Sequence, residues 1–546
     1  MTRTEEATEM LEPYLPEDST SKHLSDALMR LQRGRDGWVQ TSVPDRIELL
    51  TVCLTGLELE AADWVASACR SRKYPLGGPE EGEEWLTGPV ALLRYLRLLI
   101  HALKHGGAPP LPGSHQRSDG QWVASVFPAE PRERALMPGV SGEVWMAPGA
   151  PITQGGRYRT GPSTTGEVCL VLGGGGVTSS AAIDALHQLI VEDRVVLLKL
   201  SPMDVVVGPY IARAFWKLIE LNFFTIVFGG EETGKVLSES PAVDHIHFTG
   251  SAQTAAALSA AGVEVKSTAI GGVNPVIVCP GEWTDAELEY QARQVATMIT
   301  SGGGASCAAA QVLLMPSGWP QQAAFVDALE SALSELPCRP PVHVRSEAAH
   351  RDLQLHYPQA RLFGAGVGLP WMLIPDVPAH EGEPILAEEQ PAGVAGLVDV
   401  VAGTLEEFLA VAVRLCNTAL AGDVCATILV AGASQASNHS TIERAIADLE
   451  YGTIGLNIWP GVAMGLSVTP WGGPGSAQRN AFMLESPQKA VLRAPSHLRT
   501  TPVWFADRPG IARMGPALAS FTAAPRWRKV PRLLLASGPA LVPWRR

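Results

Sequence analysis

Between Gly166 and Val278 the chain alternates short, continuously apolar segments with segments of helical period. The apolar segments read EVCLVLG, RVVLLKL, FFTIVFG and VDHIHFTG, and helical patterns such as AAIDALHQLIVED and the stretch Val206–Leu221 separate them. A strand that is apolar on both faces must be covered on both faces, as in a parallel sheet with helices on each side. The sequence therefore predicts an α/β fold with a doubly wound, Rossmann-like nucleotide-binding layout.

The rest of the chain carries its own patterns around this unit. Apolar residues recur at helical spacing over Asp45–Arg72 and Leu86–Leu103, whereas QWVASVFP and GEVWMAPG alternate like strands. A second α/β pattern runs from about Pro280 to Gly452. We expect six segments: an N-terminal helical part of the nucleotide-binding domain (1–120), a strand ribbon that serves oligomerisation (121–160), the Rossmann-like domain (161–279), a second α/β domain (280–452), a return segment (453–494) and a basic, apolar tail (495–546).

Composition narrows the class of function. The 546 residues are 46% hydrophobic and 18% charged with a net charge of −13, which favours small-molecule chemistry and gives no basis for nucleic-acid binding. The polar N-terminus lacks the apolar region of a secretory signal, and no apolar run reaches the roughly 18 residues of a membrane span, so we expect a cytoplasmic protein. The eight cysteines are scattered, and neither disulfides nor a metal site is expected.

The C-terminal tail combines basic and apolar residues. The segment RWRKVPRLLLASGPALVPWRR holds six basic residues beside apolar stretches that prolines interrupt. Two interpretations stay open: the tail packs on its own chain or on a partner subunit, or it makes a weak contact with an anionic membrane.

Two glycine-containing segments are candidates for binding phosphate. The run Gly173–Gly176 follows a predicted strand, but Thr178 occupies the place of the third glycine of GxGxxG and no GK[ST] follows. The string HFTGS ends another strand at Gly250 and Ser251, and a helix begins at once. A hydroxyl residue at a helix N-terminus offers its side chain and free amides to a pyrophosphate, although an ordinary serine cap has the same pattern.

Cys307 is the candidate nucleophile. It lies in SGGGASCAAAQ, after the predicted strand IGGVNPVIV and a predicted helix over Thr284–Ile299. A thiol among Gly, Ala and Ser residues is open to a substrate, whereas a core cysteine usually lies among large apolar side chains. Cys307 is the only cysteine of the chain in such a setting.

In their order and spacing these strings resemble the motifs of the aldehyde dehydrogenase superfamily. The family's FTGS, ELGGKNPVIV, NAGQxC, ExFGPV and PFGG correspond to HFTGS, AIGGVNPVIV, GGGASC, AEEQPAGV and TPWGG, over about Asp45 to Pro487. The resemblance implies the aldehyde dehydrogenase fold, with residues 280–452 as the catalytic domain. It also implies NAD or NADP as cofactor, an aldehyde or acyl thioester as substrate, and a homo-oligomer, either dimer or tetramer.

The resemblance also assigns the cofactor site. Lys199 would contact the adenosine ribose, the Gly250–Ser251 pair would lie against the pyrophosphate, and Glu389 would position the nicotinamide ribose. Pro202 stands where the family usually has a glutamate that excludes a 2′-phosphate, so either NAD or NADP is expected. The predicted cofactor-binding residues are Lys199, Ser201, Gly250, Ser251, Gly271 and Glu389.

Two substitutions concern the chemistry itself. Ala269 stands where the family has its general-base glutamate, and Gly176 stands where it has the asparagine that donates to the oxyanion. We expect both to surround Cys307 together with Glu389, in a funnel between the two α/β units.

These substitutions leave two hypotheses. In an active oxidoreductase, the amide of Cys307 and a hydroxyl of Thr178, Ser179 or Ser180 would replace part of the lost oxyanion site, and release of the acyl group to water would suffer most. Such an enzyme could also run in reverse and reduce an acyl thioester. The alternative is a pseudoenzyme that keeps the fold as a structural or regulatory subunit.

Overall fold

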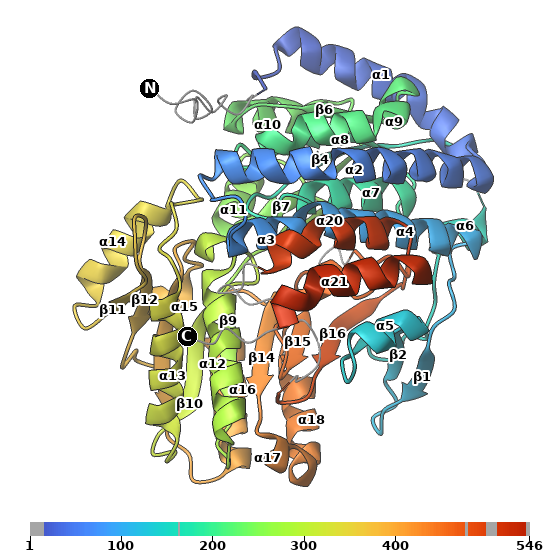
Figure 1. Cartoon of the computed structure of the whole chain (residues 1–546). Coiled ribbons are helices and arrows are strands. Elements are labelled where there is room, and N and C mark those ends of the chain that lie inside the picture. The colour runs from blue at the N-terminus through green and yellow to red at the C-terminus, as the bar shows by residue number, and fades with distance from the viewer. Residues whose placement is uncertain (1–15, 162–163, 475–478, 498–509, 542–546) are drawn as a thin grey trace.

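Two β-sheets organise the chain (Figure 1), in a computed structural model that describes residues 16–161, 164–474, 479–497 and 510–541. One sheet has five strands and the other has eleven. The functional site lies where the carboxyl ends of the smaller sheet face the larger one.

The five-stranded sheet has the order β6-β5-β4-β7-β8, and all its neighbouring strands are parallel. Since β4 comes first along the chain and has β5 on one side and β7 on the other, the strand order reverses there and leaves a crevice at the carboxyl ends. This confirms the predicted Rossmann-like layout. The strands are β4 (Val168–Leu172), β5 (Val195–Lys199), β6 (Phe224–Val227), β7 (His245–Gly250) and β8 (Ser267–Ile270).

Helices cover both faces of this sheet. The predicted helix over 206–221 is broken, because Phe215 leaves helical geometry and buries its ring against Phe224, with the ring centroids 5.4 Å apart. The elements between the strands are α7 (Ser180–Ile190), η3 (Val205–Val207), α8 (Gly208–Ala214), α9 (Trp216–Glu220), α10 (Glu231–Ser238) and α11 (Ala252–Ala260).

Two long N-terminal helices, α1 (Ser21–Gln40) and α2 (Val43–Ser71), lie along the outside of this layer (Figure 1). The hydroxyls of Thr20 and Ser42 accept hydrogen bonds from the first-turn amides of the two helices, each at 3.3 Å, so each helix begins at a side-chain cap. The buried face of α2 includes Leu50, Leu57 and Trp64.

The next segment is a run of three consecutive helical elements. It comprises α3 (Pro79–Trp85), the π-helical turn η2 (Leu86–Val90) and α4 (Ala91–Lys104), with non-helical dihedral angles at Gly88. The segment Pro79–Lys104 is long and apolar enough to cross a membrane, although the sequence analysis expected no such segment. However, 72% of its apolar window is buried inside the protein. It packs as a core helix.

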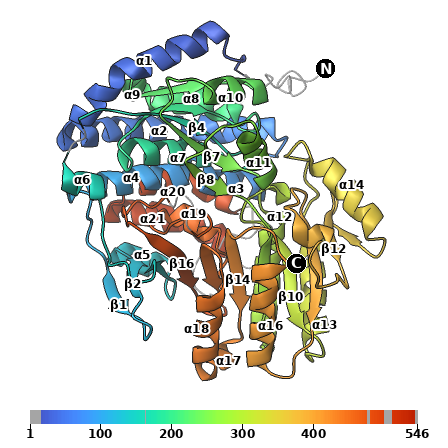
Figure 2. The same ribbon diagram turned by 180° about the vertical axis from the view of Figure 1, so that it is seen from behind.

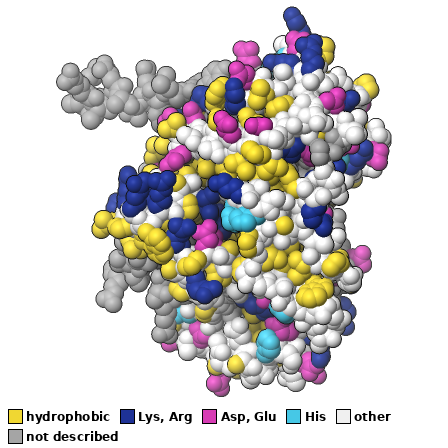
Figure 3. All heavy atoms as spheres, turned by 90° about the vertical axis from the view of Figure 1, so that its right-hand side faces the viewer, with side chains coloured by type: hydrophobic (Ala, Val, Ile, Leu, Met, Phe, Trp, Pro, Cys, Tyr) yellow, Lys and Arg dark blue, Asp and Glu magenta, His cyan; other side chains and the backbone are white. Residues whose placement is uncertain are grey.

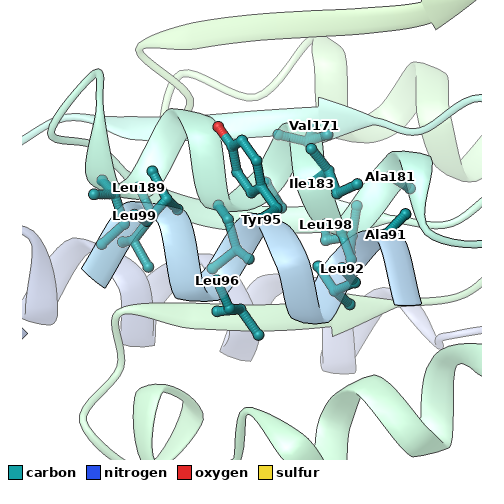
Figure 4. Packing of buried hydrophobic residues seen from close by; sticks show 14 of the residues in the cluster. Ala91, Leu92, Tyr95, Leu96, Leu99, Val171, Ala181, Ile183, Leu189 and Leu198 are labelled. Atoms are coloured by element: carbon teal, nitrogen blue, oxygen red, sulfur yellow. The ribbon is translucent and has the colours of Figure 1, made fainter. Parts of the chain in front are cut away.

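Figure 4 shows the buried side chains that hold α4 in place. Leu92, Tyr95, Leu96 and Leu99 of α4 face the side chains of α7 and of strands β4 and β5, and all are buried. Truncating one such leucine to alanine typically costs about 2–5 kcal/mol. The packing fixes α7, and with it the N-terminal end of α7 beside the site.

The eleven-stranded sheet has the order β1-β2-β3-β16-β15-β14-β9-β10-β13-β12-β11. Its seven central strands, β16 to β12, are parallel, and the strands added at both edges are antiparallel. The strands are β1 (Gly113–Gln116), β2 (Trp122–Phe127), β3 (Ser141–Met146), β9 (Asn274–Val278), β10 (Ala310–Pro316), β11 (Arg361–Phe363), β12 (Trp371–Ile374), β13 (Val394–Val400), β14 (Cys425–Leu429), β15 (Thr453–Leu456) and β16 (Pro487–Arg493).

Two strand assignments differ from the sequence analysis. Strand β9, which we had placed in the nucleotide-binding unit, pairs with β10 and β14 in the larger sheet. The chain crosses between the sheets at Gly271 and Gly272, where a Cβ on Gly272 would lie 2.7 Å from the Cα of Gly422. The ribbon β1–β3 is continuous with the same sheet, because β3 pairs with β16, and β1 begins before residue 121. The six domain boundaries stay a prediction.

Helices pack on both faces of the larger sheet (Figures 1 and 2). Residues of α16 and α18 join the buried cluster on one face, and residues of α12 and α13 join the cluster on the other. The remaining helices are α5 (Pro131–Leu136), α6 (Gly156–Thr160), α12 (Asp285–Thr300), η4 (Ser301–Gly304), α13 (Gln322–Glu335), α14 (Ser346–His356), α15 (Pro384–Ala387), α16 (Leu405–Thr418), α17 (Gly432–Ser437), α18 (His439–Asp448) and α19 (Val462–Leu466).

The tail returns to the nucleotide-binding layer as α20 (Gly510–Ala523), η5 (Trp527–Lys529) and α21 (Val530–Leu541). Ile511, Met514 and Phe521 of α20 are buried with Leu533 of α21. Helix α20 packs against α3, where a Cβ on Gly515 would lie 2.3 Å from the Trp85 ring. Figures 1 and 2 both place α21 below α4. The described part of the tail therefore packs on its own chain.

Candidate active site

A cavity of about 1050 Å³ opens at the carboxyl ends of β4, β5 and β7. Its lining includes the glycine run after β4, the first turn of α11, and residues of the larger sheet's loops. Cys307, Ala269 and Glu389 line this cavity together. The three residues come from segments that are far apart in sequence, and the fold brings them to one place.

The loop that carries Cys307 follows α12 and depends on three glycines. Gly302, Gly303 and Gly304 have φ values of +60°, +68° and +82°, a region that side chains disfavour. A Cβ on Gly304 would lie 1.8 Å from the backbone nitrogen of Gly393, so no larger residue fits there. The glycines of GGGASC thus serve close backbone packing as well as access to the thiol.

Asn274, the first residue of β9, fixes the other end of this loop. Its Nδ2 donates to the carbonyl oxygens of Cys307 and Ala309, both at 2.9 Å, and its Oδ1 accepts from the amide of Cys425 at 3.3 Å. One buried amide side chain therefore connects the nucleophile loop to two strands of the larger sheet.

Glu83 of α3 holds the loop from the nucleotide-binding side, and the sequence analysis did not identify it. Its Oε1 accepts from the amide of Gly302 at 2.7 Å and from the hydroxyl of Ser301 at 3.1 Å, and its Oε2 pairs with Arg339 at 2.6 Å. Both Glu83 and Arg339 are buried. The signal in the sequence was the acidic string PEEGEEW inside an apolar stretch, because buried carboxylates require partners.

The Cys307 thiol is protonated at neutral pH in this structure. Burial raises its pKa to about 11 and the negative charge of Glu389 adds to the shift, while Arg479 and the Trp471 side chain act in the opposite direction. A thiolate is the reactive form of cysteine. The site therefore needs a group that accepts the thiol proton.

Glu389 is the candidate for this proton acceptor. Burial raises its pKa to about 7, Arg345 lowers it, and the neighbouring carboxylate of Glu388 raises it. Its carboxylate lies against Gly271, where a Cβ would be 2.3 Å from Oε2. The lack of a side chain at Gly271 thus admits Glu389 two residues beyond Ala269.

Ala269 contributes only a methyl group to the cavity. It lies on β8 opposite Thr249 of β7, at the carboxyl end of the smaller sheet. Strand β8 therefore places no carboxylate in the cavity.

We expected Gly176 to face Cys307, but it does not line the cavity, and its backbone groups are bonded elsewhere. Its N–H donates to Oδ2 of Asp204 at 3.1 Å, and its carbonyl accepts from Nη2 of Arg72 at 3.2 Å. Its neighbours Gly175 and Val177 line the cavity and Gly176 does not. The amide of Gly176 is therefore not available to an oxyanion.

The hydroxyls that follow Gly176 also require a correction. Thr178 donates to the carboxylate of Glu84 and Ser179 donates to the carbonyl of Thr87, and both side chains are buried away from the cavity. Of the three candidates, only Ser180 lines the cavity. Thr178 thus belongs to a buried charge network that includes Glu84 and Arg72, and Ser179 is bonded to the backbone of Thr87.

The predicted cofactor residues line the same cavity: Lys199, Ser201, Gly250, Ser251, Gly271 and Glu389. The Lys199 ammonium has no ion-pair partner among the described residues, and burial lowers its pKa. The hydroxyl of Ser251 accepts from the amide of Thr254 at 3.2 Å, so it caps α11. The crevice offers a cation and a helix N-terminus, and these features suit a dinucleotide.

The glycine run after β4 has a packing role in addition. A Cβ on Gly173 would lie 2.5 Å from that of Ala181, and a Cβ on Gly174 would lie 2.7 Å from Thr249. A Cβ on Gly175 would lie 2.7 Å from the Ser201 hydroxyl. The run thus permits close approach of α7, β7 and the loop after β5.

Arg479 is a second residue that the sequence analysis missed. It lines the cavity, pairs with the buried carboxylate of Asp184 on α7, and donates to the hydroxyl of Ser180 at 3.2 Å. Asp184 also accepts from the hydroxyl of Thr249 at 2.9 Å, and its pKa lies well below the usual value because Arg479 and His247 oppose its desolvation. An arginine outside any recognised motif carries no signal in one sequence.

Comparisons with known proteins agree with this geometry. A model of the aldehyde dehydrogenase family matches residues 182–349. An N-succinylglutamate 5-semialdehyde dehydrogenase of Sphingopyxis alaskensis is 32% identical over 135 residues, which are 22% of this chain and 26% of that protein's length. The sequence match therefore spans about a quarter of the curated relative.

The likeness in fold extends over much more of the chain. Aldehyde dehydrogenase 21 from Physcomitrella patens, solved with its reaction product succinate, superposes with a TM-score of 0.61 at 16% identity, over 87% of this chain and 91% of that one. The NADP-dependent glyceraldehyde-3-phosphate dehydrogenase from Bacillus halodurans, solved with NADP, gives 0.58 at 16% identity, over 87% and 92%. The family model thus matches one part of the chain, and the solved structures show that the chain has the aldehyde dehydrogenase fold.

Proposed function

We propose that the protein is an NAD(P)-dependent oxidoreductase that acts on an aldehyde, or in reverse on an acyl thioester, through a covalent intermediate on Cys307. One observation carries the proposal. Cys307 and Glu389 line the cavity that also contains the crevice at the strand-order reversal of the smaller sheet. A nucleophile and a nucleotide-sized crevice in one cavity are what such a reaction needs.

The cofactor would be held by the residues at the carboxyl ends of β5 and β7. Lys199 and Ser201 are placed for the adenosine ribose, and the first-turn amides of α11 are placed for the pyrophosphate. When bound, NAD(P) supplies the acceptor or donor of hydride. Because Pro202 lines the cavity in place of a glutamate, we propose that both NAD and NADP bind.

The first half-reaction requires the Cys307 thiol to lose its proton. Glu389, with a pKa of about 7, is suited to accept it, since it is half ionised near neutral pH. The sulfur then attacks the carbonyl carbon of the aldehyde to give a thiohemiacetal, and removal of hydride leaves the acyl group as a thioester of Cys307. Ser180 and the Cys307 amide would stabilise the negative oxygen in place of Gly176.

The second half-reaction transfers the acyl group from Cys307. Ala269 cannot activate water, whereas a thiol such as coenzyme A is already a good nucleophile. We therefore propose acyl transfer to a thiol as the faster route, with the reduction of acyl thioesters to aldehydes as its reverse.

A pseudoenzyme is the second candidate, and a specific observation favours it. The amide of Gly176 is bonded to Asp204, and the pKa of Cys307 is raised to about 11, so both parts of the usual apparatus are weakened. In that case the fold would serve as a structural or regulatory subunit.

The location and assembly of the protein belong to the same proposal. All eight cysteines are free thiols, as in a reducing, cytoplasmic compartment. The ribbon β1–β3 ends the larger sheet in an edge strand, and we propose that it supports a homodimer or homotetramer.

The test is a substrate panel with the purified protein. Aldehydes of varied chain length are assayed with NAD or NADP, and acyl-CoA esters with NADH or NADPH, by following absorbance of the reduced cofactor. Activity that Cys307→Ala abolishes and Cys338→Ala retains supports the oxidoreductase, since Cys338 lies outside the cavity. If no substrate turns over and calorimetry shows no cofactor binding at millimolar concentration, the pseudoenzyme is the correct reading.

A further inference from the structure

The last 37 residues of the chain have a charge opposite to that of the rest. From Gly510 to Arg546 there is no aspartate or glutamate, although the whole chain has a net charge of −13. The basic residues of this segment are Arg513, Arg526, Arg528, Lys529, Arg532, Arg545 and Arg546. Such segregation points to an anionic partner rather than to solubility.

The structure places several of these residues beside exposed apolar side chains. Trp527 is 62% exposed, Leu534 is 53% exposed and Leu535 is 82% exposed. Arg526, Arg528 and Arg532 are exposed as well, and none has an ion-pair partner among the residues that the structure describes. We call these six residues the basic hairpin face.

The basic hairpin face is held in place from below. Leu533 is 4% exposed and packs with Ile511, Met514 and Phe521 of α20, so its neighbours Leu534 and Leu535 are directed outward. Lys529 donates to the carbonyl of Ser520 at 2.6 Å and so closes the turn between the helices. The exposed leucines are therefore a fixed feature of a packed helix pair.

A neighbouring helix adds one exposed arginine. Arg132 of α5 donates to the carbonyl of Pro525 and pairs with Glu130 at 3.0 Å, whereas the exposed Arg134 on the same short helix has no ion-pair partner among the described residues. Figure 3 views the molecule from the side on which α20 and α21 meet, and it shows Lys and Arg side chains gathered next to a hydrophobic patch. Basic and apolar groups thus share one surface.

We propose that the basic hairpin face docks the protein on an anionic lipid surface. Arginines meet lipid phosphates at the headgroup level, while a tryptophan and leucines enter the interface. A second copy of the chain is a poorer fit, because a twofold contact would bring like charges together. Nucleic acid would use the arginines but would leave Leu534 and Leu535 exposed to water.

The experiment is sedimentation of the full chain with lipid vesicles. One set is phosphatidylcholine alone, and the other contains about one third phosphatidylglycerol at about 0.1 M salt. We expect pelleting with the anionic vesicles only. The double variant Arg528→Gln/Arg532→Gln should weaken partitioning by about 25-fold, about fivefold for each charge.

Matched variants on other surface helices control for stability and total charge. Arg351→Gln/Arg414→Gln removes two exposed charges from α14 and α16 and should change nothing. Leu534→Ala/Leu535→Ala should weaken binding even at low salt, whereas Leu355→Ala on α14, which is 77% exposed, should not.

Four results would overturn the proposal. Equal pelleting with neutral and anionic vesicles would show that binding does not depend on lipid charge. No pelleting with either would show that the protein does not bind lipid surfaces. Binding of a DNA duplex with the arginine dependence and without the leucine dependence would make nucleic acid the partner. A loss of self-association in the arginine variants, seen by sedimentation velocity without any vesicle effect, would identify a second copy.

Discussion

At the scale of single residues, the site is defined by which polar groups already have hydrogen-bond partners within the protein. Gly176 has no side chain to offer, and its amide is bonded to Asp204. The loop that carries Glu389 offers its carboxylate no such hydrogen-bond partner. Glu389 faces the cavity with a pKa of about 7. Of the residues that the motifs indicate for the chemistry, Cys307, Ala269 and Glu389 line the cavity and Gly176 does not.

The first prediction concerns the ionisation of Cys307. Since burial and the charge of Glu389 raise the thiol pKa to about 11, alkylation by iodoacetamide should increase with pH well beyond pH 9 in the protein without cofactor. Glu389→Gln removes one cause of the shift and should lower the apparent thiol pKa, whereas Glu388→Gln should leave it unchanged. A thiol that titrates near its ordinary value in both proteins would contradict this assignment.

The second prediction concerns Gly304. An alanine there would place its Cβ 1.8 Å from the Gly393 nitrogen, so the Cys307 loop would have to move. We expect Gly304→Ala to cost more than about 4 kcal/mol or to abolish Cys307 reactivity. Gly318→Ala is the matched control, because Gly318 also has positive φ but nothing within 4 Å, and it should cost only about 1–2 kcal/mol. Denaturant unfolding measures both, and equal costs would show that the close approach is unimportant.

At the scale of elements, the short helix α3 connects the nucleotide-binding layer to the nucleophile loop. Its Glu83 binds Gly302 and Ser301 on one side and Arg339 on the other, and its Glu84 belongs to the network around Gly176. The tail helix α20 also packs against α3. The site is therefore supported by an element that none of the family motifs includes.

The third prediction tests this support. Glu83→Gln removes the closer of the two carboxylates that pair with the buried Arg339 and leaves Glu80 at 3.7 Å, so the cost should not exceed the about 3–5 kcal/mol of a fully broken buried pair; the variant also loosens the Cys307 loop. We expect a lower melting temperature and faster alkylation of Cys307 relative to wild type. Glu81→Gln, on the same helix but not bonded to the loop, should change alkylation little. Unchanged alkylation in Glu83→Gln would mean that the loop is held by Asn274 and the glycines alone.

Elements with strong periodicity could be predicted from the sequence, and elements set by long-range packing could not. Strands β4 to β7 were predicted because continuous apolar runs permit few alternatives. The break at Phe215 and the place of β9 in the larger sheet depend on tertiary packing, which overrides local pattern. Glu83 and Arg479 were missed for the same reason, since their partners lie far away in sequence.

At the scale of the whole molecule, the cavity lies where two sheets meet, and the charge of the surface is unevenly divided. The crevice of the smaller sheet and the nucleophile loop of the larger one close around the same volume. The basic hairpin face lies on the outside of the same nucleotide-binding layer. Catalysis and membrane docking are thus separate proposals, and a failure of one leaves the other intact.

The central claim is that Cys307 takes the acyl group from an aldehyde in a first, fast half-reaction. Stopped-flow mixing of the protein and NAD or NADP with excess of an aldehyde to which the substrate panel shows a response measures this directly. We predict a burst of reduced cofactor close to one equivalent per chain, followed by slow turnover that added coenzyme A accelerates and that Ala269→Glu accelerates without it. A full burst in Cys307→Ala, or steady turnover in wild type without any burst and without a response to the thiol, would contradict the account.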